Sequence, residues 1–197
     1  KAVDDNKWES SPDFCFYLDP IEELTGKRLG IYGFGQIGQQ VAKLALAFGI
    51  QVKAINKYPE RNQMQEVEFV NEDELIAQSE ILSLHIPLSP ASSEMINTQF
   101  LNKMPANAIL VNTGRGGLIH EQDLADQLNS NNLRAAFLDV LSTEPPLSTN
   151  PLLKAKNCFI TPHVAWASVE SPKRLMQGLA HNIQAFISKQ SLNRLDL

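Results

Sequence analysis

The sequence is poor in cysteine and has no long hydrophobic segment, and each shortage excludes a class of protein. Its two cysteines, Cys15 and Cys158, have neither CxxC nor Cys/His spacing, so the sequence indicates no disulfide framework and no zinc site, and we expect no bound metal. No apolar run approaches the length that spans a bilayer, and no signal-peptide pattern opens the chain. We therefore expect a cytoplasmic protein without a membrane partner.

Basic charge is scarce as well. The formal net charge is -5, and the lysines and arginines form no run. Affinity for phosphate backbones needs a concentrated basic face, so we expect no nucleic-acid partner. What remains is ordinary globular composition, with 43% hydrophobic residues in a chain of 197. The chain opens on Lys1, and "KAVDDNKW" is typical of the end of a helix, so we expect it to be part of a longer protein.

Short continuous apolar runs alternate with amphipathic segments along most of the chain. Continuous runs favour strands buried on both faces of a parallel sheet, and we expect such strands at 28–32, 51–55, 81–86, 108–112, 134–140 and 158–162. Helices are expected at 36–49, where Ile37, Val41, Leu44 and Phe48 recur at helical spacing, at 72–79 behind an Asn71 cap, and at 121–130. The alternation predicts right-handed crossovers and a doubly wound α/β sheet.

The last segment departs from this alternation. Ser171 and Pro172 suit the N-cap and first position of a helix. A stripe of apolar residues follows on one face, made of Leu175, Leu179, Ile183, Phe186 and Ile187. We therefore divide the chain into a sheet domain at 1–170 and a C-terminal helix and tail at 171–197.

A glycine motif is the sharpest local signal in the sequence. Gly33, Gly35 and Gly38 form G-x-G-x-x-G directly after an expected strand and at the start of an expected helix. The first glycine permits a tight turn, the second lets a pyrophosphate approach the backbone, and the third allows close helix–strand packing. In this setting the motif predicts a dinucleotide-binding domain of the Rossmann type, with free N–H groups at the helix start facing the phosphates.

The end of the second strand bears on the choice between NAD and NADP. An acidic residue commonly binds the ribose 2′-hydroxyl of NAD there, but this chain has Asn56, followed by Lys57 and, nearby, Arg61. The missing carboxylate and the cations favour acceptance of a 2′-phosphate, so we predict NAD(P) binding with NADP slightly favoured. The alternative is that Asn56 binds the hydroxyl of NAD while the cations are merely solvated.

Three ionisable residues each lie just past an expected strand. Arg115 follows "AILVNTG", Glu144 follows "RAAFLDVLST" and His163 follows "CFITP". Ligands bind at the carboxyl ends of the strands in open α/β sheets, so the three side chains are expected to face one cleft. Taken singly, each has an ordinary explanation as a solvated turn arginine, a loop carboxylate or a turn histidine.

Together these motifs carry a family resemblance. "GFGQIG", "HIPLSPASSEMIN", "ILVNTGRGGLIHEQDL", "FLDVLSTEPP" and "ITPHVAWAS" occur in the order found in the D-isomer-specific 2-hydroxyacid dehydrogenases, from about residue 8 to 190. The stretches "KWESSPDFCFYLDPIEELTGKRLGI" and "HVAWAS" resemble the glycerate dehydrogenase, or hydroxypyruvate reductase, branch most. The resemblance implies hydride transfer between a nicotinamide cofactor and a small D-2-hydroxy or 2-keto acid such as glycerate, hydroxypyruvate or glyoxylate.

The family's roles carry over to matching positions. Arg115 would bind the substrate carboxylate, His163 would move the hydroxyl proton, and Glu144 would hold the second imidazole nitrogen. Asp139 would meet the nicotinamide carboxamide, although it could instead be a cap or a satisfied acid at the end of a strand. The remaining cofactor contacts implied are Gln36 and Ile37 at the pyrophosphate and His85, Pro87 and Thr113 along the groove. Trp166 could narrow the substrate pocket or pack across an interface.

The resemblance also implies parts that this sequence does not show. Family members have an N-terminal substrate domain, to which the 171–188 helix would cross back, and they form homodimers through the cofactor domain. We expect the 197 residues alone to bind cofactor and to turn over poorly. Other functions compatible with the fold are an NAD(H)-sensing corepressor and a phosphoglycerate or D-lactate dehydrogenase.

Overall fold

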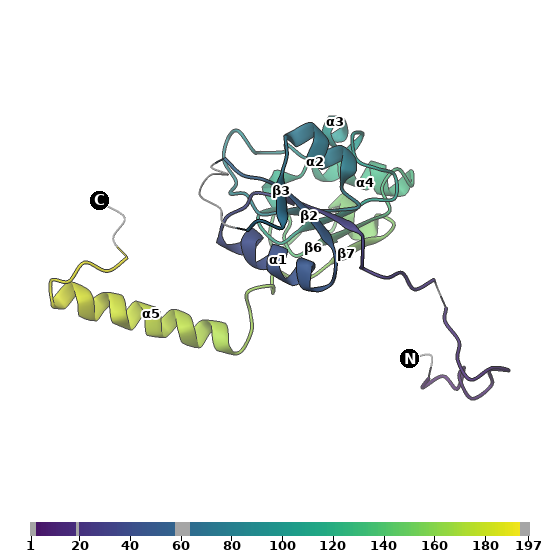
Figure 1. Cartoon of the computed structure of the whole chain (residues 1–197), viewed down its shortest axis with the longest axis horizontal. Helices are drawn as coiled ribbons and strands as arrows, with labels where there is room; N and C mark the ends of the chain where they lie inside the picture. Colours follow the sequence, from purple (N-terminus) through teal and green to yellow (C-terminus); the bar gives the residue numbers. More distant parts are fainter. Residues whose placement is uncertain (1–2, 19, 58–63, 194–197) are drawn as a thin grey trace.

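The computed structural model describes residues 3–18, 20–57 and 64–193. Its centre is a parallel sheet of seven strands in the order β3-β2-β1-β4-β5-β6-β7, drawn in Figure 1. The strands are β1 (Arg28–Tyr32), β2 (Gln51–Ile55), β3 (Val67–Phe69), β4 (Ile81–Leu84), β5 (Ile109–Asn112), β6 (Ala135–Leu138) and β7 (Cys158–Ile160). The chain turns back at β1, since β2 and β3 extend to one side and β4 to β7 to the other, which makes the gap between β1 and β4 the topological switch point.

Helices follow the strands as expected for a doubly wound sheet. They are α1 (Gln36–Ala47), α2 (Glu72–Gln78), α3 (Thr98–Leu101), α4 (Glu121–Asn129) and α5 (Glu170–Ile187), with 3-10 turns η2 (Gly116–Leu118) and η3 (Pro151–Lys154). The predicted Rossmann-type fold is confirmed. The Asn71 cap is also confirmed, because its side chain accepts a hydrogen bond from the Glu74 N–H at 2.9 Å.

Several predicted boundaries were wrong. The strands expected at 81–86, 134–140 and 158–162 end two residues earlier, because the chain there already turns into loops. The last helix begins at Glu170, so Ser171 and Pro172 lie in its first turn and Val169 occupies the cap position. Strand β3 and helix α3 were not predicted, since three and four residues carry too little periodicity.

Two apolar clusters hold the helices against the sheet. Leu82, Leu84 and Leu110 of the central strands pack with α2, α3 and α4 on one face. On the other face Leu29, Ile31 and their neighbours pack against α1. In Figure 1 these helices lie on opposite sides of the sheet. The arrangement leaves the carboxyl edge of the sheet to the loops that carry the predicted site residues.

The buried face of α1 differs from the predicted one. Ile37, Leu44 and Phe48 are 69%, 65% and 61% exposed, whereas the buried residues of the helix are Gly38, Ala42 and Ala45. Small side chains on the inner face let the helix axis approach β1 and β2 closely. Ile37, Leu44 and Phe48 therefore point outward, whereas Val41, the fourth residue of the predicted stripe, is partly buried and packs against the core.

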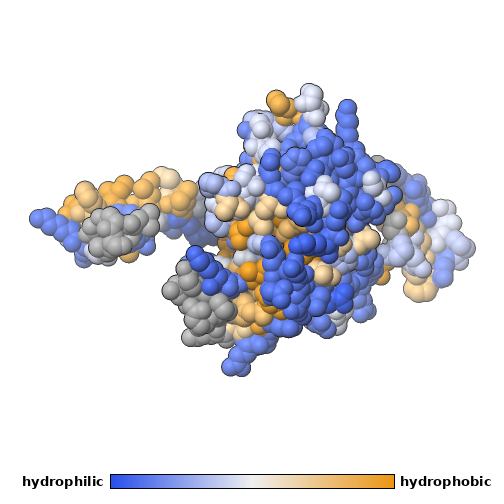
Figure 2. Space-filling model, turned by 90° about the horizontal axis from the view of Figure 1, so that it is seen from above, coloured by the Kyte–Doolittle hydropathy of each residue, from blue (hydrophilic) through white to orange (hydrophobic). Residues whose placement is uncertain are grey.

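Both ends of the described chain extend away from the sheet in Figure 1. Residues 3–10, where the end of a helix was expected, form turns. Helix α5 carries its apolar stripe in the open, from Leu175 at 71% exposed to Phe186 at 84%, and Figure 2 shows the stripe along the projecting arm. None of the helices in the described part of the chain has the length and apolar character needed to cross a membrane.

Candidate functional site

The glycine motif forms a cradle between β1 and α1. Gly33 has φ +104°, a conformation that suits glycine, and a Cβ on Gly38 would lie 2.4 Å from the Gly33 carbonyl oxygen. Gly35 has open space around its Cα, and α1 has neither a side-chain cap nor an acidic residue in its first turn. Exposed Gln36 and Ile37 border this helix start. The cradle therefore fits a dinucleotide pyrophosphate bound to the N-terminus of α1.

Replacing Gly38 by alanine tests the cradle. We expect the dissociation constant for NADH to rise at least about tenfold, because an added Cβ must displace backbone and such overlaps cost about 1–3 kcal/mol. Fluorescence titration of the purified chain measures the change. Gly178→Ala is the matched control, since a Cβ there meets nothing within 4 Å, and it should leave binding unchanged. Equal affinities for Gly38→Ala and the unmodified chain would contradict the assignment.

The loop after β4 lies against the glycine motif, where a Cβ on Gly33 would meet the His85 carbonyl oxygen at 2.7 Å. The His85 N–H donates to the Tyr32 carbonyl at 2.8 Å, and the His85 ring nitrogen Nε2 lies 2.9 Å from Ser83 Oγ. Burial lowers the pKa of His85, which favours the neutral imidazole at neutral pH. The Pro87 carbonyl accepts from the Ser92 hydroxyl at 2.9 Å. These hydrogen bonds hold the loop that contains His85 and Pro87 in place. The contact of the two residues with the cofactor stays a prediction.

The residues that bear on cofactor selectivity lie at the end of β2. Asn56 and Lys57 follow Ile55 directly, on the strand next to β1, so they are near the edge of the cradle. Arg61 lies outside the described residues. The preference for NADP thus stays a prediction.

A buried asparagine shapes the loop that carries Arg115. Asn112 is fully buried at the end of β5; its Oδ1 accepts from the Gly114 N–H at 3.0 Å, and its Nδ2 donates to the Arg115 carbonyl at 2.9 Å. A Cβ on Gly116 would lie 1.9 Å from the Leu141 carbonyl carbon, so two backbones touch here. Arg115 and Thr113 are left exposed at the carboxyl edge. The sequence interpretation missed Asn112 and Gly116, whose only signal was their place within the glycine-rich motif.

Glu144 and His163 are in direct contact. His163 Nδ1 lies 2.6 Å from Glu144 Oε2, and the other carboxylate oxygen accepts from the Leu141 N–H at 3.0 Å. The hydrogen bond with His163, followed by that from Leu141, holds the pKa of Glu144 below its usual value. The ionised carboxylate only accepts hydrogen bonds, so Nδ1 carries the proton, and Nε2 remains to exchange a proton with a ligand.

Arg115 lies at the same cavity as this pair. A cavity of about 180 Å³ is lined by Arg115, Glu144 and His163 together with Leu88 and the backbone of Gly116 and Gly117. A second, largely apolar cavity of about 540 Å³ adjoins the same glutamate and histidine and is lined by Pro145, Pro146, Leu153 and Ile160. Trp166 is 59% exposed and lines neither cavity, so both of its proposed roles stay predictions.

Asp139 is largely occupied by its own chain. Its side chain, in a residue only 5% exposed, accepts hydrogen bonds from the Thr161 hydroxyl and from the Val164 and Ala165 N–H groups, both at 2.9 Å. Burial raises the pKa of Asp139, but these hydrogen bonds outweigh it and hold the pKa below its usual value. The structure thus gives Asp139 the alternative role of a satisfied strand-end acid, and its contact with nicotinamide stays a prediction.

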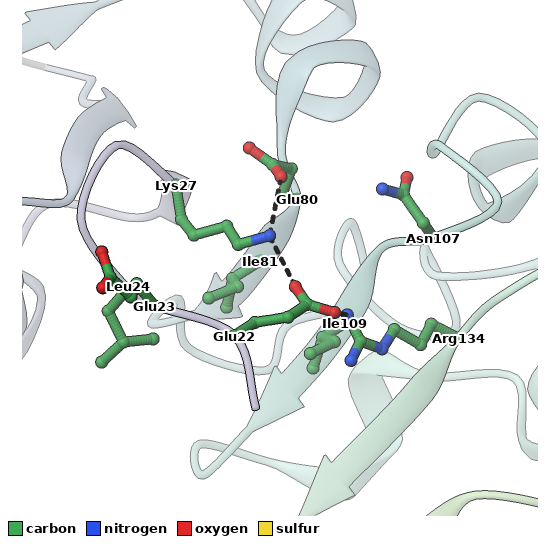
Figure 3. A pocket seen from close by; sticks show the side chains of 9 residues that line it. All are labelled: Glu22, Glu23, Leu24, Lys27, Glu80, Ile81, Asn107, Ile109 and Arg134. Atoms are coloured by element: carbon green, nitrogen blue, oxygen red, sulfur yellow. Dashed lines mark hydrogen bonds and ion pairs between the residues drawn. The ribbon is translucent and has the colours of Figure 1, made fainter. Parts of the chain in front are cut away.

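The opposite edge of the sheet has a different character. Figure 3 shows a cavity of about 240 Å³ there, where Lys27 lies between Glu22 and Glu80. Lys27 Nζ is 2.7 Å from Glu22 Oε2, and the other oxygen of Glu22 is 3.0 Å from Arg134 Nη1. These ion pairs tie residues 22–27 to β4 and β6, and none of the predicted site residues lies at this edge.

Metal-binding geometry is missing from the part of the chain that the structure describes. No group of three or more His, Cys, Asp or Glu residues there could hold a metal ion. Cys15 and Cys158 are both free, and burial raises the pKa of the Cys158 thiol to about 11.

Known proteins are similar to this chain in sequence and in fold. A hydroxypyruvate reductase of Blautia hydrogenotrophica is 46% identical over 98% of this chain and 60% of its own length, and a glycerate dehydrogenase of Methylorubrum extorquens is 38% identical over 94% and 58%. An acyclic imino acid reductase solved with NADPH and D-Arg superposes with a TM-score of 0.83 at 32% identity, covering 97% of this chain and 60% of that one.

The chain therefore spans about 60% of the length of the curated relatives it matches. Residues 1–165 match the family described as D-isomer specific 2-hydroxyacid dehydrogenase, NAD binding domain. The glycine cradle at β1 and the three strand-end residues lie within this match. The chain belongs to the D-isomer specific 2-hydroxyacid dehydrogenase family, of which it contains the NAD-binding domain.

Proposed function

We propose that the intact protein is an NAD(P)-dependent D-2-hydroxyacid dehydrogenase that interconverts a short 2-keto acid and its D-2-hydroxy acid. The observation that carries this proposal is the contact between Glu144 and His163, because this hydrogen-bonded pair lines the same cavity as Arg115. A cation for a carboxylate and a proton carrier for an adjacent oxygen are the two groups that a 2-keto acid requires. The relatives named hydroxypyruvate reductase and glycerate dehydrogenase support glycerate and hydroxypyruvate, with glyoxylate as the shorter alternative.

The three residues have different roles in this proposal. Arg115 binds the carboxylate of the substrate through its planar guanidinium and polarises the neighbouring keto oxygen. His163 delivers a proton from Nε2 to that oxygen in reduction and removes it in oxidation. Glu144 fixes the orientation of the ring through its contact with Nδ1. When bound, the nicotinamide cofactor supplies or accepts the hydride.

The cofactor contacts follow the course of the carboxyl edge. Gly33, Gly35 and Gly38 let the pyrophosphate approach the start of α1, where Gln36 and Ile37 flank it. His85, Pro87 and Thr113 border the groove toward the nicotinamide, and Asp139 lies at its far end. These assignments rest on the fit of the cradle and on the family's NAD-binding domain.

A panel of 2-keto acids assayed with the full-length protein tests the function. We expect NAD(P)H-dependent reduction of hydroxypyruvate and glyoxylate, and weaker reduction of branched 2-keto acids. Cofactor binding without turnover of any acid would contradict the proposal and favour a nucleotide sensor. If 3-phosphohydroxypyruvate were reduced faster than the other acids, the protein would be a phosphoglycerate dehydrogenase. If pyruvate were reduced fastest, it would be a D-lactate dehydrogenase.

We further propose that NADPH is accepted and slightly preferred. Asn56 stands where a carboxylate would repel a 2′-phosphate, and Lys57 adds a positive charge beside it. Parallel fluorescence titrations with NADH and NADPH measure the preference. A tenfold preference for NADH would contradict the proposal, and Lys57→Gln should weaken NADPH binding more than NADH binding.

The intact protein completes surfaces that are open in this chain. We propose that a substrate domain covers the apolar stripe of α5 and that two copies associate through the cofactor domain, as the family resemblance implies. Two sets of exposed apolar residues support such contacts. One is Ile37 and Leu44 on α1 with Phe48 directly after it, and the other is the stacked pair Phe137 and Phe159, whose ring centroids are 4.8 Å apart. A cytoplasmic location belongs to the same proposal and is supported by the two free cysteines.

A further inference from the structure

The segment after β7 holds His163 in a backbone conformation that histidine seldom adopts. Its φ is +54°, in the left-handed region, where a residue other than glycine persists only if its surroundings fix it. The His163 N–H donates to the Asp139 carbonyl at 2.9 Å and to the Thr161 carbonyl at 2.9 Å. The end of β6 therefore sets the position of the histidine backbone.

The side chain of Asp139 completes this anchorage. One carboxylate oxygen accepts from the Thr161 hydroxyl before His163 and from the Val164 N–H after it, and the second accepts from the Ala165 N–H. A single carboxylate thus binds donors on both sides of His163. Since ionised acceptors make stronger hydrogen bonds than neutral ones, this clamp is well suited to fix the strained residue.

The clamp and the Glu144 contact act on different parts of the histidine. Glu144 contacts the ring at Nδ1, whereas the hydrogen bonds of Asp139 join it to the Thr161 hydroxyl and to the backbone on both sides of His163, and Asp139 acts on the ring only through its charge. A ring held at one nitrogen still rotates and shifts if its Cα moves. Catalytic groups that are misplaced by about 1 Å lose about a hundredfold in rate, so the backbone anchor bears on the reaction itself.

We propose that Asp139 and Thr161 are positioning residues that act through the 161–165 backbone to hold His163 against Glu144. The inference rests on the proposed function for its kinetic consequence but not for its structural one. It gives Asp139 a task that requires no contact with the nicotinamide. It also gives a task to Thr161, for which the sequence interpretation had none.

Substitutions at Thr161 separate positioning from stability. Thr161 is exposed, so Thr161→Val removes the hydroxyl while keeping the shape and disturbing no core residue. Thr161→Ser keeps the hydroxyl and is the matched control. Asp139→Asn is the second test. Both carboxylate oxygens of Asp139 accept from backbone N–H groups, and in asparagine an NH₂ group, which is a donor, would replace one of these acceptors and face an N–H.

The primary measurement is the ¹⁵N spectrum of the His163 ring in the 197-residue chain, recorded where the imidazole is neutral. We expect a single Nδ1–H tautomer in the unmodified chain and in Thr161→Ser. Thr161→Val and Asp139→Asn should give a mixture of tautomers and faster hydrogen exchange at the Val164 and Ala165 amides. Unchanged ring signals and exchange in both variants would overturn the proposal.

Kinetics of the full-length protein form the second arm. In Thr161→Val we expect kcat for 2-keto acid reduction to fall about 10–100-fold with little change in cofactor affinity, and Thr161→Ser to restore it. A loss confined to thermal stability, with kcat unchanged, would overturn a positioning role. If no 2-keto acid is turned over at all, the proposed function fails, while the ring spectra still decide whether the clamp positions His163.

Discussion

Replacing His163 by asparagine is expected to lower kcat/KM for 2-keto acid reduction by about 10²–10⁴-fold, the usual contribution of a positioned general acid. This corresponds to about 3–5 kcal/mol of transition-state stabilisation. Asparagine is the appropriate replacement because it tolerates the left-handed backbone found at φ +54°, so the variant removes the ring without adding strain. Steady-state kinetics of the full-length protein with hydroxypyruvate measure the effect.

Two controls accompany this variant. The dissociation constant for NADH should stay within about twofold of the unmodified protein, since the glycine cradle lies at another strand. The melting temperature should also change little, because the His163 side chain is 42% exposed and its pair with Glu144 is partly in water. A kcat/KM within a few-fold of the unmodified enzyme would show that another group supplies the proton.

Replacing Arg115 by lysine is expected to lower kcat/KM by about 10²–10³-fold, as found when one charged or polar donor to a reacting oxygen is lost. Lysine keeps the charge but not the planar fork, which matches a carboxylate through two parallel N–H donors. The side chain is held at its base by the loop that Asn112 braces, so the loss arises at the guanidinium and not in the fold. The same kinetic assay measures it, as a fall in kcat from the weaker polarisation of the keto oxygen together with a rise in KM from the weaker grip on the carboxylate.

A matched pair of substrates identifies what Arg115 binds. If it binds a carboxylate, the unmodified enzyme should prefer a 2-keto acid strongly over the corresponding 2-keto amide, and the lysine variant should lose most of this preference. Equal losses on acid and amide would mean that Arg115 acts on the keto oxygen alone. An unchanged KM for the acid would place the carboxylate elsewhere.

The candidate site was largely predictable because it depends on topology. Parallel strands end at one edge of a sheet, so residues just past three apolar runs had to lie near one another whatever their side-chain geometry. Arg115 and His163 are far apart in sequence yet line one cavity for this reason. The glycine motif was also predictable, since Gly33 and Gly38 meet steric demands of the backbone and Gly35 leaves open space for a ligand.

The orientation of α1 was not predictable from periodicity. Hydrophobic spacing grouped Ile37, Val41, Leu44 and Phe48 on one face. The structure turns Gly38, Ala42 and Ala45 inward, and of the predicted four only Val41 packs against the core. Periodicity measures hydrophobicity, but this helix is placed by how closely its backbone must approach β1. The requirement for small residues at Gly38 was visible in the motif and should have outweighed the larger apolar side chains.

The supporting hydrogen bonds were also beyond the sequence. Asn112 and Thr161 occur in strand-like stretches where polar residues carry no signal of their partners. For Asp139 the sequence offered a contact with the cofactor or, as the alternative, a cap or a satisfied strand-end acid, and neither names the donors that it binds. Their roles depend on which strands are neighbours. Asp139, directly after β6, accepts a hydrogen bond from Thr161, directly after β7, because β6 and β7 lie side by side. Strand order, which separate local patterns do not specify, decides such contacts.

The lengths of the sheet's outer strands affect how this domain behaves at high concentration. β3 and β7, the two edge strands, have three residues each, the shortest in the sheet. An exposed edge recruits other chains in proportion to the unpaired N–H and C=O groups it offers, and short edges offer few. We therefore expect the open apolar surfaces of the separate domain, and not strand addition, to drive any self-association, so that amyloid-like fibres are the less favoured product.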